Sequence, residues 1–319
     1  MKAAVLNKLD SVPFYIDFPD PVPQDETQIV MNVKAAALKN LDKVKTKEFY
    51  YAHYSSLPVV VGTDGVGTLS DGTNVYAMGI TGTLGQKSLI SANRYTVLPA
   101  NIDFALAAAL PNAVLGSAIP LKDRAEMKQG DVVLINGATG ITGKVAVQIA
   151  KYYGASKIIV TGRNQESLQA LKTLGADVAI SILQDDETFL QQIKEIDQTT
   201  PIDIVLDYIW GKPAELIMNA FQNRHGNKIR FVTMGDMAGR TFPISSGVLR
   251  SADILLMGSG FGSLTPEVMS LYINKILPEM FALAAAGKLT IETESMNLKD
   301  ISTAWSVDSK GKRLVVIID

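Results

Sequence analysis

The 319-residue sequence contains no cysteine and only two histidines, His53 and His225. The missing thiols exclude disulfides, thiol nucleophiles, iron–sulfur clusters and every zinc site that needs thiolate ligands. The two histidines lie far apart in the sequence and neither stands in an H-E-x-x-H context, so an all-protein zinc site is not expected either. We therefore expect chemistry that needs no metal.

Blocks of like charge and long apolar runs are also missing. The formal net charge is −2, and neither a basic block for nucleic acid nor an acidic tail is present. The opening MKAAVLNKLD lacks the sustained apolar stretch of a signal peptide, and no later segment approaches the length of a membrane-spanning helix. We expect a globular cytoplasmic protein, long enough for two domains that each bury a core.

The most informative segment present is DVVLINGATGITGKVAVQIAKYYGASKIIVTGRN, residues 131–164. Its pattern predicts a buried strand over Val132–Ile135, a glycine-rich turn, a helix over Ile141–Tyr153 and a second strand over Lys157–Thr161. The inward face of the helix is expected to carry Val145, Ile149 and Tyr152.

The glycine-rich turn matches A-x-G-x-x-G, with Ala138 where the dinucleotide-binding fingerprint usually has its first glycine. Gly140 would let the backbone approach a pyrophosphate, and Gly143 would let the helix pack closely on the strand. The helix N-terminus would direct its N–H groups at the anion. The residues predicted to contact the cofactor here are Thr139, Gly140, Ile141, Thr142 and Gly143.

The end of the second strand indicates which dinucleotide binds. About twenty residues after the last glycine, an NAD site carries Asp or Glu for the ribose hydroxyls. This sequence has Arg163 and Asn164 there, and its first acid is Glu166. Arg163 can hold a 2′-phosphate through charge-assisted hydrogen bonds. We predict NADPH over NADH, with Arg163 and Asn164 at the cofactor; the alternative is that Arg163 is a solvated loop cation.

The alternation of strands and helices continues to about residue 257. Strands are expected over 178–181, 203–207, 229–234 and 254–257, and helices over 165–174, 187–198 and 213–221. Together with the strands over Val132–Ile135 and Lys157–Thr161, these make six strands. They predict an α/β fold with a doubly wound parallel sheet, in which ligands bind beyond the carboxyl ends of the strands. The residues predicted to face the nicotinamide half from these ends are Asp207, Tyr208, Gly235 and Ser259. The alternative is that each of these residues lies in a simple loop.

The two ends of the chain have a different pattern. Short alternating runs over Met1–Leu6, Gln28–Val33 and Pro58–Val61, separated by turn residues, predict an antiparallel β barrel. A long helix is expected over Pro266–Gly287, and a final strand over Arg313–Ile318 could return to the first domain. The expected division is a barrel over 1–120, a nucleotide-binding domain over 121–263, and the long helix with the returning segment over 264–319.

The sequence resembles the medium-chain dehydrogenase/reductase superfamily, in particular its zinc-independent quinone oxidoreductase branch. The resemblance covers nearly the whole chain and rests on MKAAVL, VKAAALKNLD, LPVVVGTDGVG, AAALPNAVLGSAIPL, GATGITGKVAVQIAK and KGKRLVVII. It implies a GroES-like barrel built from both ends of the chain and a Rossmann domain inserted between them. It also implies NADPH in an interdomain cleft and a homodimer.

Departures from the zinc-dependent members exclude the alcohol dehydrogenase mechanism. Those members have a catalytic cysteine where this chain has Ala37–Asp42, and His-Glu where it has Thr63 and Asp64. The quinone reductase branch usually has asparagine in A-A-x-V-N-x-x-D, but here Lys39 aligns with it and Asn40 follows. Either residue could have taken over its role; the alternative is that Lys39 is a solvated lysine and Asn40 a turn residue.

Hydride addition to a carbonyl compound leaves negative charge on oxygen, which needs stabilisation. Without a metal, quinones and α,β-unsaturated carbonyls are favoured, because the product phenolate or enolate delocalises that charge. Lys39 and Asn40 are the first catalytic candidates for stabilising that oxygen. The resemblance places the aromatic segment Phe49–Tyr54 beside the cleft, where Tyr51 or His53 could donate a hydrogen bond to the substrate, and Tyr51 is the third catalytic candidate. The alternative is that these aromatics cover the end of the barrel and that His53 is a surface residue.

The sequence therefore predicts an NADPH-dependent, zinc-independent reductase of quinones or enones. The alternative is an NADPH-binding redox sensor or structural protein with little turnover.

Overall fold

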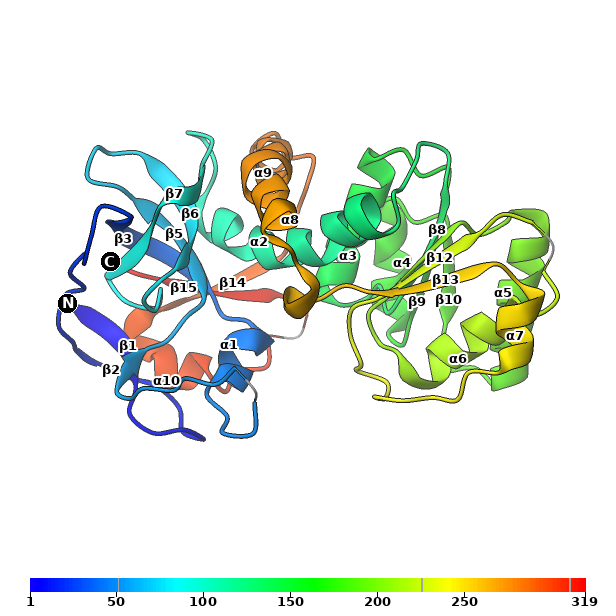
Figure 1. The fold of residues 1–319 in the computed structure, drawn as a ribbon, viewed down its shortest axis with the longest axis horizontal. Helices are drawn as coiled ribbons and strands as arrows, with labels where there is room; N and C mark the ends of the chain where they lie inside the picture. Colours follow the sequence, from blue (N-terminus) through cyan, green and yellow to red (C-terminus); the bar gives the residue numbers. More distant parts are fainter. Residues whose placement is uncertain (51, 225, 310) are drawn as a thin grey trace. The chain divides into compact units, whose positions relative to one another are not determined.

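A computed structural model describes residues 1–50, 52–224, 226–309 and 311–319. The chain forms two compact units, which we call the barrel unit (Met1–Pro111 and Ile273–Asp319) and the Rossmann unit (Asn112–Tyr272) (Figure 1). The expected domain boundaries at residues 120 and 263 stay a prediction.

The Rossmann unit contains a six-stranded parallel sheet with the order β10-β9-β8-β11-β12-β13. The strands are β8 (Val132–Asn136), β9 (Lys157–Gly162), β10 (Val178–Ser181), β11 (Ile204–Asp207), β12 (Ile229–Thr233) and β13 (Ile254–Gly258). Strands β8 and β11 are fully buried, as their continuous apolar runs predict. The chain changes direction across the sheet between β8 and β11, so the predicted doubly wound fold is confirmed.

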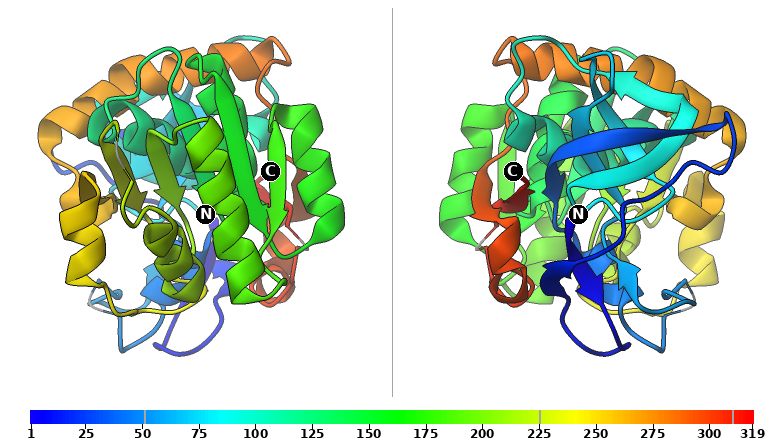
Figure 2. Two further views of the ribbon diagram at one scale, coloured as in Figure 1. Left: turned by 90° about the vertical axis from the view of Figure 1, so that its right-hand side faces the viewer. Right: turned by 90° about the vertical axis from the view of Figure 1, so that its left-hand side faces the viewer.

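Helices lie on both faces of this sheet (Figure 2). They include α3 (Ile141–Tyr152), α4 (Gln165–Leu174), α5 (Asp186–Thr199), α6 (Gly211–Ala220) and α7 (Ser246–Ser251). The prediction that Tyr152 faces inward is wrong, because its side chain is 49% exposed. Val145 and Ile149 are buried as expected, but the buried stripe of α3 continues through Ala146 and Ala150 and leaves Tyr152 outside.

The barrel unit is antiparallel in its central part, as predicted. Its larger sheet has the order β14-β15-β3-β5-β6-β7, and an additional pairing between β3 and β7 closes the barrel. A smaller sheet has the order β2-β1-β4. The strands are β1 (Lys2–Leu6), β2 (Phe14–Asp17), β3 (Gln28–Ala37), β4 (Val59–Val60), β5 (Asp64–Thr68), β6 (Asn74–Gly79), β7 (Lys87–Val97), β14 (Thr293–Asn297) and β15 (Arg313–Ile317).

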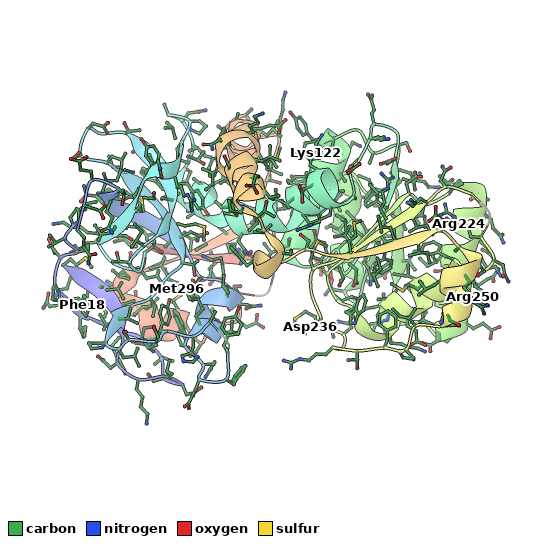
Figure 3. All side chains as sticks on the ribbon, viewed as in Figure 1. Phe18, Lys122, Arg224, Asp236, Arg250 and Met296 are labelled. Atoms are coloured by element: carbon green, nitrogen blue, oxygen red, sulfur yellow. The ribbon has the colours of Figure 1, made fainter. Side chains whose placement is uncertain are left out.

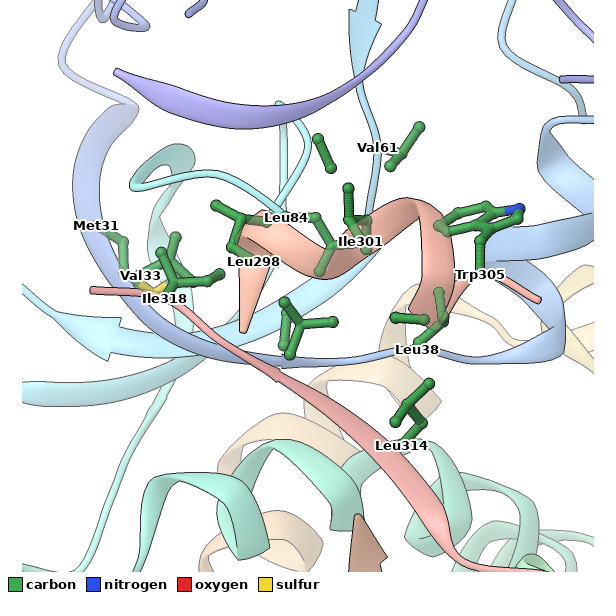
Figure 4. Close-up of a cluster of buried hydrophobic side chains, with 14 of the residues drawn as sticks. Met31, Val33, Leu38, Val61, Leu84, Leu298, Ile301, Trp305, Leu314 and Ile318 are labelled. Atoms are coloured by element: carbon green, nitrogen blue, oxygen red, sulfur yellow. The ribbon is translucent and has the colours of Figure 1, made fainter. Parts of the chain in front are cut away.

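Both ends of the chain build this unit, as the family resemblance implied. Strand β15 pairs antiparallel with β3, opposing Val316 to Ala36, so the predicted return of the last strand is confirmed. The shared core joins side chains from the N-terminal strands to those of α10 (Ile301–Ala304) and β15 (Figure 4). Its members include Met31, Val33, Leu84, Ile301, Trp305 and Leu314.

Two helical stretches of the described chain are long and apolar. Phe104–Arg124 comprises α2 (Phe104–Ile119) and the π-helical η1 (Pro120–Arg124). Pro266–Ala285 comprises α8 (Pro266–Leu271), the π-helical η3 (Tyr272–Ile276) and α9 (Leu277–Ala285). Both meet the length and composition of a membrane span, so the expectation that no segment approaches it is wrong. The apolar window of the first stretch is 72% buried, which is typical of a core helix.

Candidate functional site

The glycine-rich turn between β8 and α3 begins with a glycine, Gly137, one residue before Ala138, which the sequence alignment places at the first glycine position. Gly137 has φ +83°, and a Cβ there would lie 2.5 Å from Ile209 Cγ2. The tight turn therefore needs glycine at 137, one residue before Ala138. A Cβ on Gly143 would lie 2.5 Å from Ala138 Cα, whereas one on Gly140 would meet nothing closer than 3.9 Å. Gly143 is thus required by packing inside the protein, and Gly140 leaves open space beside the turn.

Helix α3 presents an uncapped N-terminus at this turn. Gly140 is the N-cap residue and supplies no side-chain cap. Lys144 N donates to Gly140 O at 2.9 Å, and the N–H groups of Ile141, Thr142 and Gly143 precede this first bond of the helix. Unsatisfied N–H groups and the helix dipole favour an anion here. All five residues predicted at the pyrophosphate, 139–143, belong to this turn and helix start.

Arg163 lies directly after β9 and close to the same turn. A Cβ on the preceding Gly162 would lie 2.4 Å from Thr139 Cγ2, so the end of β9 touches the turn. The Arg163 side chain is exposed and forms no ion pair or hydrogen bond with another residue of the described chain. Asn164 Oδ1 accepts a hydrogen bond from Ser167 N at 2.7 Å and caps α4, so the side-chain oxygen of Asn164 is already in use.

Asp207 and Tyr208 direct their polar atoms into the protein. Asp207 is fully buried, and burial raises the pKa of its carboxyl group. Asn136 Nδ2 donates to Asp207 Oδ1 at 2.8 Å, and Thr233 Oγ1 donates to Asp207 Oδ2 at 3.0 Å. Tyr208 Oη donates to Gly116 O at 2.7 Å, and burial raises the pKa of this hydroxyl, which keeps it protonated. Direct contact of either side chain with a cofactor stays a prediction.

Gly235 and Ser259 lie just beyond the carboxyl ends of β12 and β13. A Cβ on Gly235 would lie 2.3 Å from Tyr208 O, so this close approach of two loops requires glycine. Ser259 N donates to Thr233 O at 2.9 Å and extends the pairing of the two strands. The loop after β12 continues through Asp236, which Figure 3 labels.

In the barrel unit, Lys39 is buried, with 3% of its surface exposed. Its Nζ donates to Asp64 Oδ1 at 2.5 Å and to Ala37 O at 2.9 Å, and lies 3.2 Å from Asp42 Oδ2. Three acceptors match the three protons of an ammonium group. Burial would lower the pKa of Lys39, but Asp42 and Asp64 outweigh burial and raise it. The alternative reading of Lys39 as a solvated lysine is wrong.

The carboxylates that hold Lys39 have further partners. Tyr76 Oη donates to Asp64 Oδ2 at 2.9 Å, and Thr63 Oγ1 donates to Asp42 Oδ1 at 2.7 Å. The segments Ala37–Asp42 and Thr63–Asp64, which align with the ligand positions of zinc-dependent relatives, thus meet through an ion pair. Among the described residues, no group of three or more His, Cys, Asp or Glu is arranged to hold a metal ion.

The other catalytic candidates lie on or near α1 (Asn40–Lys45). Asn40 is exposed and is the first residue of this helix, so the reading of Asn40 as a turn residue is wrong. Tyr51 lies outside the described residues. His53 is exposed, so the alternative that it is a surface residue is confirmed. Its Nδ1 lies 2.8 Å from Tyr50 O. Tyr54 packs against the barrel core, whereas Phe49 is 77% exposed.

Sequence reasoning missed the buried polar residues that support these sites. Asn136, Thr161 and Thr233 each lie at or next to the carboxyl end of an apolar strand. A polar residue at that point was the available signal. Its partner could not be assigned, because partners across a sheet depend on strand order.

Comparison with known proteins agrees with this architecture. A family model described as "Zinc-binding dehydrogenase" matches residues 142–276. A probable NADPH-dependent quinone reductase of Emericella nidulans is 25% identical, with 96% of each chain covered. The chloroplastic NADPH-dependent alkenal/one oxidoreductase of Arabidopsis thaliana is 36% identical over 50% of this chain and 46% of that protein. The Escherichia coli quinone oxidoreductase complexed with NADPH has a TM-score of 0.81 at 23% identity, covering 99% of this chain and 100% of that one.

The fold, the glycine-rich turn and the similarity to known proteins agree with one another. Over nearly its whole length, the chain is similar to quinone oxidoreductases of the medium-chain dehydrogenase/reductase superfamily.

Proposed function

We propose that this chain is an NADPH-dependent, zinc-independent reductase that transfers hydride to a quinone or an α,β-unsaturated carbonyl compound. The observation that carries the proposal is the uncapped start of α3 beside Arg163, whose side chain has no ion-pair or hydrogen-bond partner among the described residues. The names of relatives, an NADPH-dependent quinone reductase and an alkenal/one oxidoreductase, support the substrate class.

The residues of the Rossmann unit fit NADPH chemically. The N–H groups of Ile141, Thr142 and Gly143 would bind the pyrophosphate, with Gly140 leaving room for its close approach. Arg163 would bind the 2′-phosphate, because a guanidinium pairs with phosphate oxygens through two parallel hydrogen bonds. When bound, NADPH supplies the hydride.

Lys39, Asn40 and Tyr51 are the proposed catalytic residues. The acceptor takes up the hydride with its electron pair, and its oxygen then carries negative charge until a proton from solvent completes the product. Asn40 is exposed and can donate its side-chain N–H to that oxygen. Lys39 Nζ already donates to Asp64 and to Ala37 O and is ion-paired with Asp42, so it would act on the oxygen by its positive charge rather than by a new hydrogen bond.

The alternative function is an NADPH-binding redox sensor or structural protein with little turnover. Lys39 aligns with the usual asparagine of the quinone reductase branch, and its ammonium group is held by Asp64, Asp42 and Ala37 O. This arrangement favours the alternative. Two measurements separate the functions: NADPH binding by fluorescence, and NADPH oxidation against a panel of quinones and enones. Turnover on at least one acceptor supports the reductase, whereas tight binding without turnover on any acceptor supports the sensor.

We also propose a cytoplasmic homodimer that binds neither nucleic acid nor membrane. Strand β13 is an edge of its sheet, and its Leu255 and Leu256 are 45% and 38% exposed. An apolar edge strand of this kind favours pairing with another strand, and a two-fold axis would pair β13 with its copy. Light scattering after size exclusion tests the dimer, and Leu255→Lys should convert it to a monomer. A monomeric wild-type chain would refute it.

A further inference from the structure

The carboxyl ends of four neighbouring strands are joined by one series of buried and partly buried hydrogen bonds. The N–H of Gly137 donates to Thr161 Oγ1 at 3.1 Å, and the Thr161 hydroxyl donates to Asn136 Oδ1 at 2.6 Å. Asn136 Nδ2 and Thr233 Oγ1 then donate to the two oxygens of Asp207. Asn136, Thr161 and Asp207 are fully buried. We call these five residues the Asp207 relay.

Asp207 is also linked to the glycine-rich turn through the loop that carries the Ile209 side chain. Its Oδ1 also accepts from Ile209 N at 3.3 Å and from Trp210 N at 3.1 Å. Trp210 has φ +54° and ψ −153°, a backbone conformation that is costly for any residue with a Cβ. The turn held in this way places the Ile209 side chain directly against Gly137.

We infer that Asp207 is a positioning residue for the cofactor, which fixes the Gly137 turn in its anion-binding shape through the hydrogen bonds of the relay. The inference rests on the proposed cofactor site. Without the relay, the N–H of Gly137 would be unpaired. The turn would then be less ordered, because glycine can adopt many backbone conformations. Binding would then have to order the turn, which lowers affinity.

The chemistry around Asp207 favours this role over one in stability. Its contacts are amide groups and a hydroxyl, and burial raises the pKa of its carboxyl group, so the charge is costly to keep there. Asp197, near the opposite end of β11, is also buried but forms a 2.9 Å ion pair with Arg224, which Figure 3 labels. It accepts from Ile202 N at 2.8 Å. Asp197 is therefore a matched control: a buried carboxylate in the same unit, outside the relay.

The test measures the dissociation constants of NADPH and of ADP-ribose for a set of variants of the full chain. Asp207→Ala should weaken both ligands about tenfold, the loss expected for about one hydrogen bond. Thr161→Val should weaken them by several-fold. Because both act through one relay, the double variant should bind about as weakly as Asp207→Ala alone. Asp207→Asn keeps the oxygen acceptor and should stay within about twofold of wild type.

Asp197→Ala should lower the melting temperature but leave both dissociation constants unchanged. Amide hydrogen exchange gives a second readout, since Asp207→Ala should raise exchange at Gly137 and Trp210. Wild-type affinity in Asp207→Ala, or effects that multiply in the double variant, would overturn the inference alone. A wild-type chain that binds neither ligand would overturn the proposed function together with it.

Discussion

The two units use their polar groups in opposite ways. In the Rossmann unit, the start of α3 leaves N–H groups without acceptors, and Arg163 has no partner among the residues described. In the barrel unit, the buried ammonium of Lys39 is held by Asp64, Asp42 and a carbonyl oxygen. The first arrangement can accept an anionic ligand, whereas the second is already satisfied within the protein.

Breaking the satisfied cluster should give the largest effect. Lys39→Ala leaves Asp42 and Asp64 buried without their cation, which should destabilise the protein by about 3 to 5 kcal/mol. Lys34 is exposed on β3, so Lys34→Ala is the control and should change stability by less than about 0.5 kcal/mol. Urea unfolding of both variants measures this difference. Equal stabilities would contradict the description of Lys39 as a buried ion-pair partner.

Removing the unpaired cation should affect binding rather than folding. Arg163→Ala should weaken NADPH about ten- to a hundredfold, since a hydrogen bond to a charged group contributes roughly 1.5 to 3 kcal/mol. NADH lacks the 2′-phosphate, so its affinity should not change. Arg250→Ala, which removes another exposed cation of the Rossmann unit, is the control. Retained NADPH affinity in Arg163→Ala would refute the cofactor assignment.

Asn40 tests whether the barrel unit contributes to the chemistry. Asn40→Ala should lower kcat with an enone about tenfold, because one donor to the developing oxyanion is lost. NADPH affinity should be unchanged, since Asn40 is not among the proposed cofactor contacts. Steady-state kinetics beside fluorescence binding separates the two effects. Unchanged turnover in single replacements of Lys39, Asn40 and Tyr51 would remove the catalytic assignment.

The smallest effect is expected from the charge on Asp207. Burial raises the pKa of this carboxyl group above its unfolded value, so the folded protein holds the proton more tightly than the unfolded chain. The charged form therefore costs stability at neutral pH, and the cost disappears as the pH falls through the folded pKa. Asp207→Asn should raise Tm at neutral pH by less than about 4 °C, the shift that roughly 1 kcal/mol produces in a domain of this size. The gain in Tm should vanish in acid. A gain in Tm that grew as the pH fell would contradict a raised pKa for Asp207.

Much of the Rossmann unit was predictable because its signals are local. Apolar β-branched runs predicted β8 and β9, and the order of strands and helices predicted the sheet. The location of the turn glycine at Gly137 was missed, because the fingerprint gives spacing and not backbone angles. The relay was missed because Asn136 and Asp207 are 71 residues apart and meet only when β8 and β11 pair.

The barrel unit was less predictable at its polar positions. Lys39 carries no sequence signal of burial, and its partner Asp64 lies 25 residues away, at the start of β5. Two of the alternatives for Lys39 and Asn40 failed because each assumed an irregular, solvated segment, whereas the chain forms helix α1 with Asp42 accepting from Lys39 N.

Hydride transfer from NADPH to a conjugated acceptor is the reaction that we propose for this chain. The most direct test is the initial rate of NADPH oxidation by the wild-type protein with a quinone and with an enone, beside the same assay with NADH. We expect turnover with NADPH and at least about tenfold lower kcat/KM with NADH, since only NADPH offers a 2′-phosphate to Arg163. Equal kcat/KM for both cofactors, or NADPH binding without turnover on either acceptor, would contradict it.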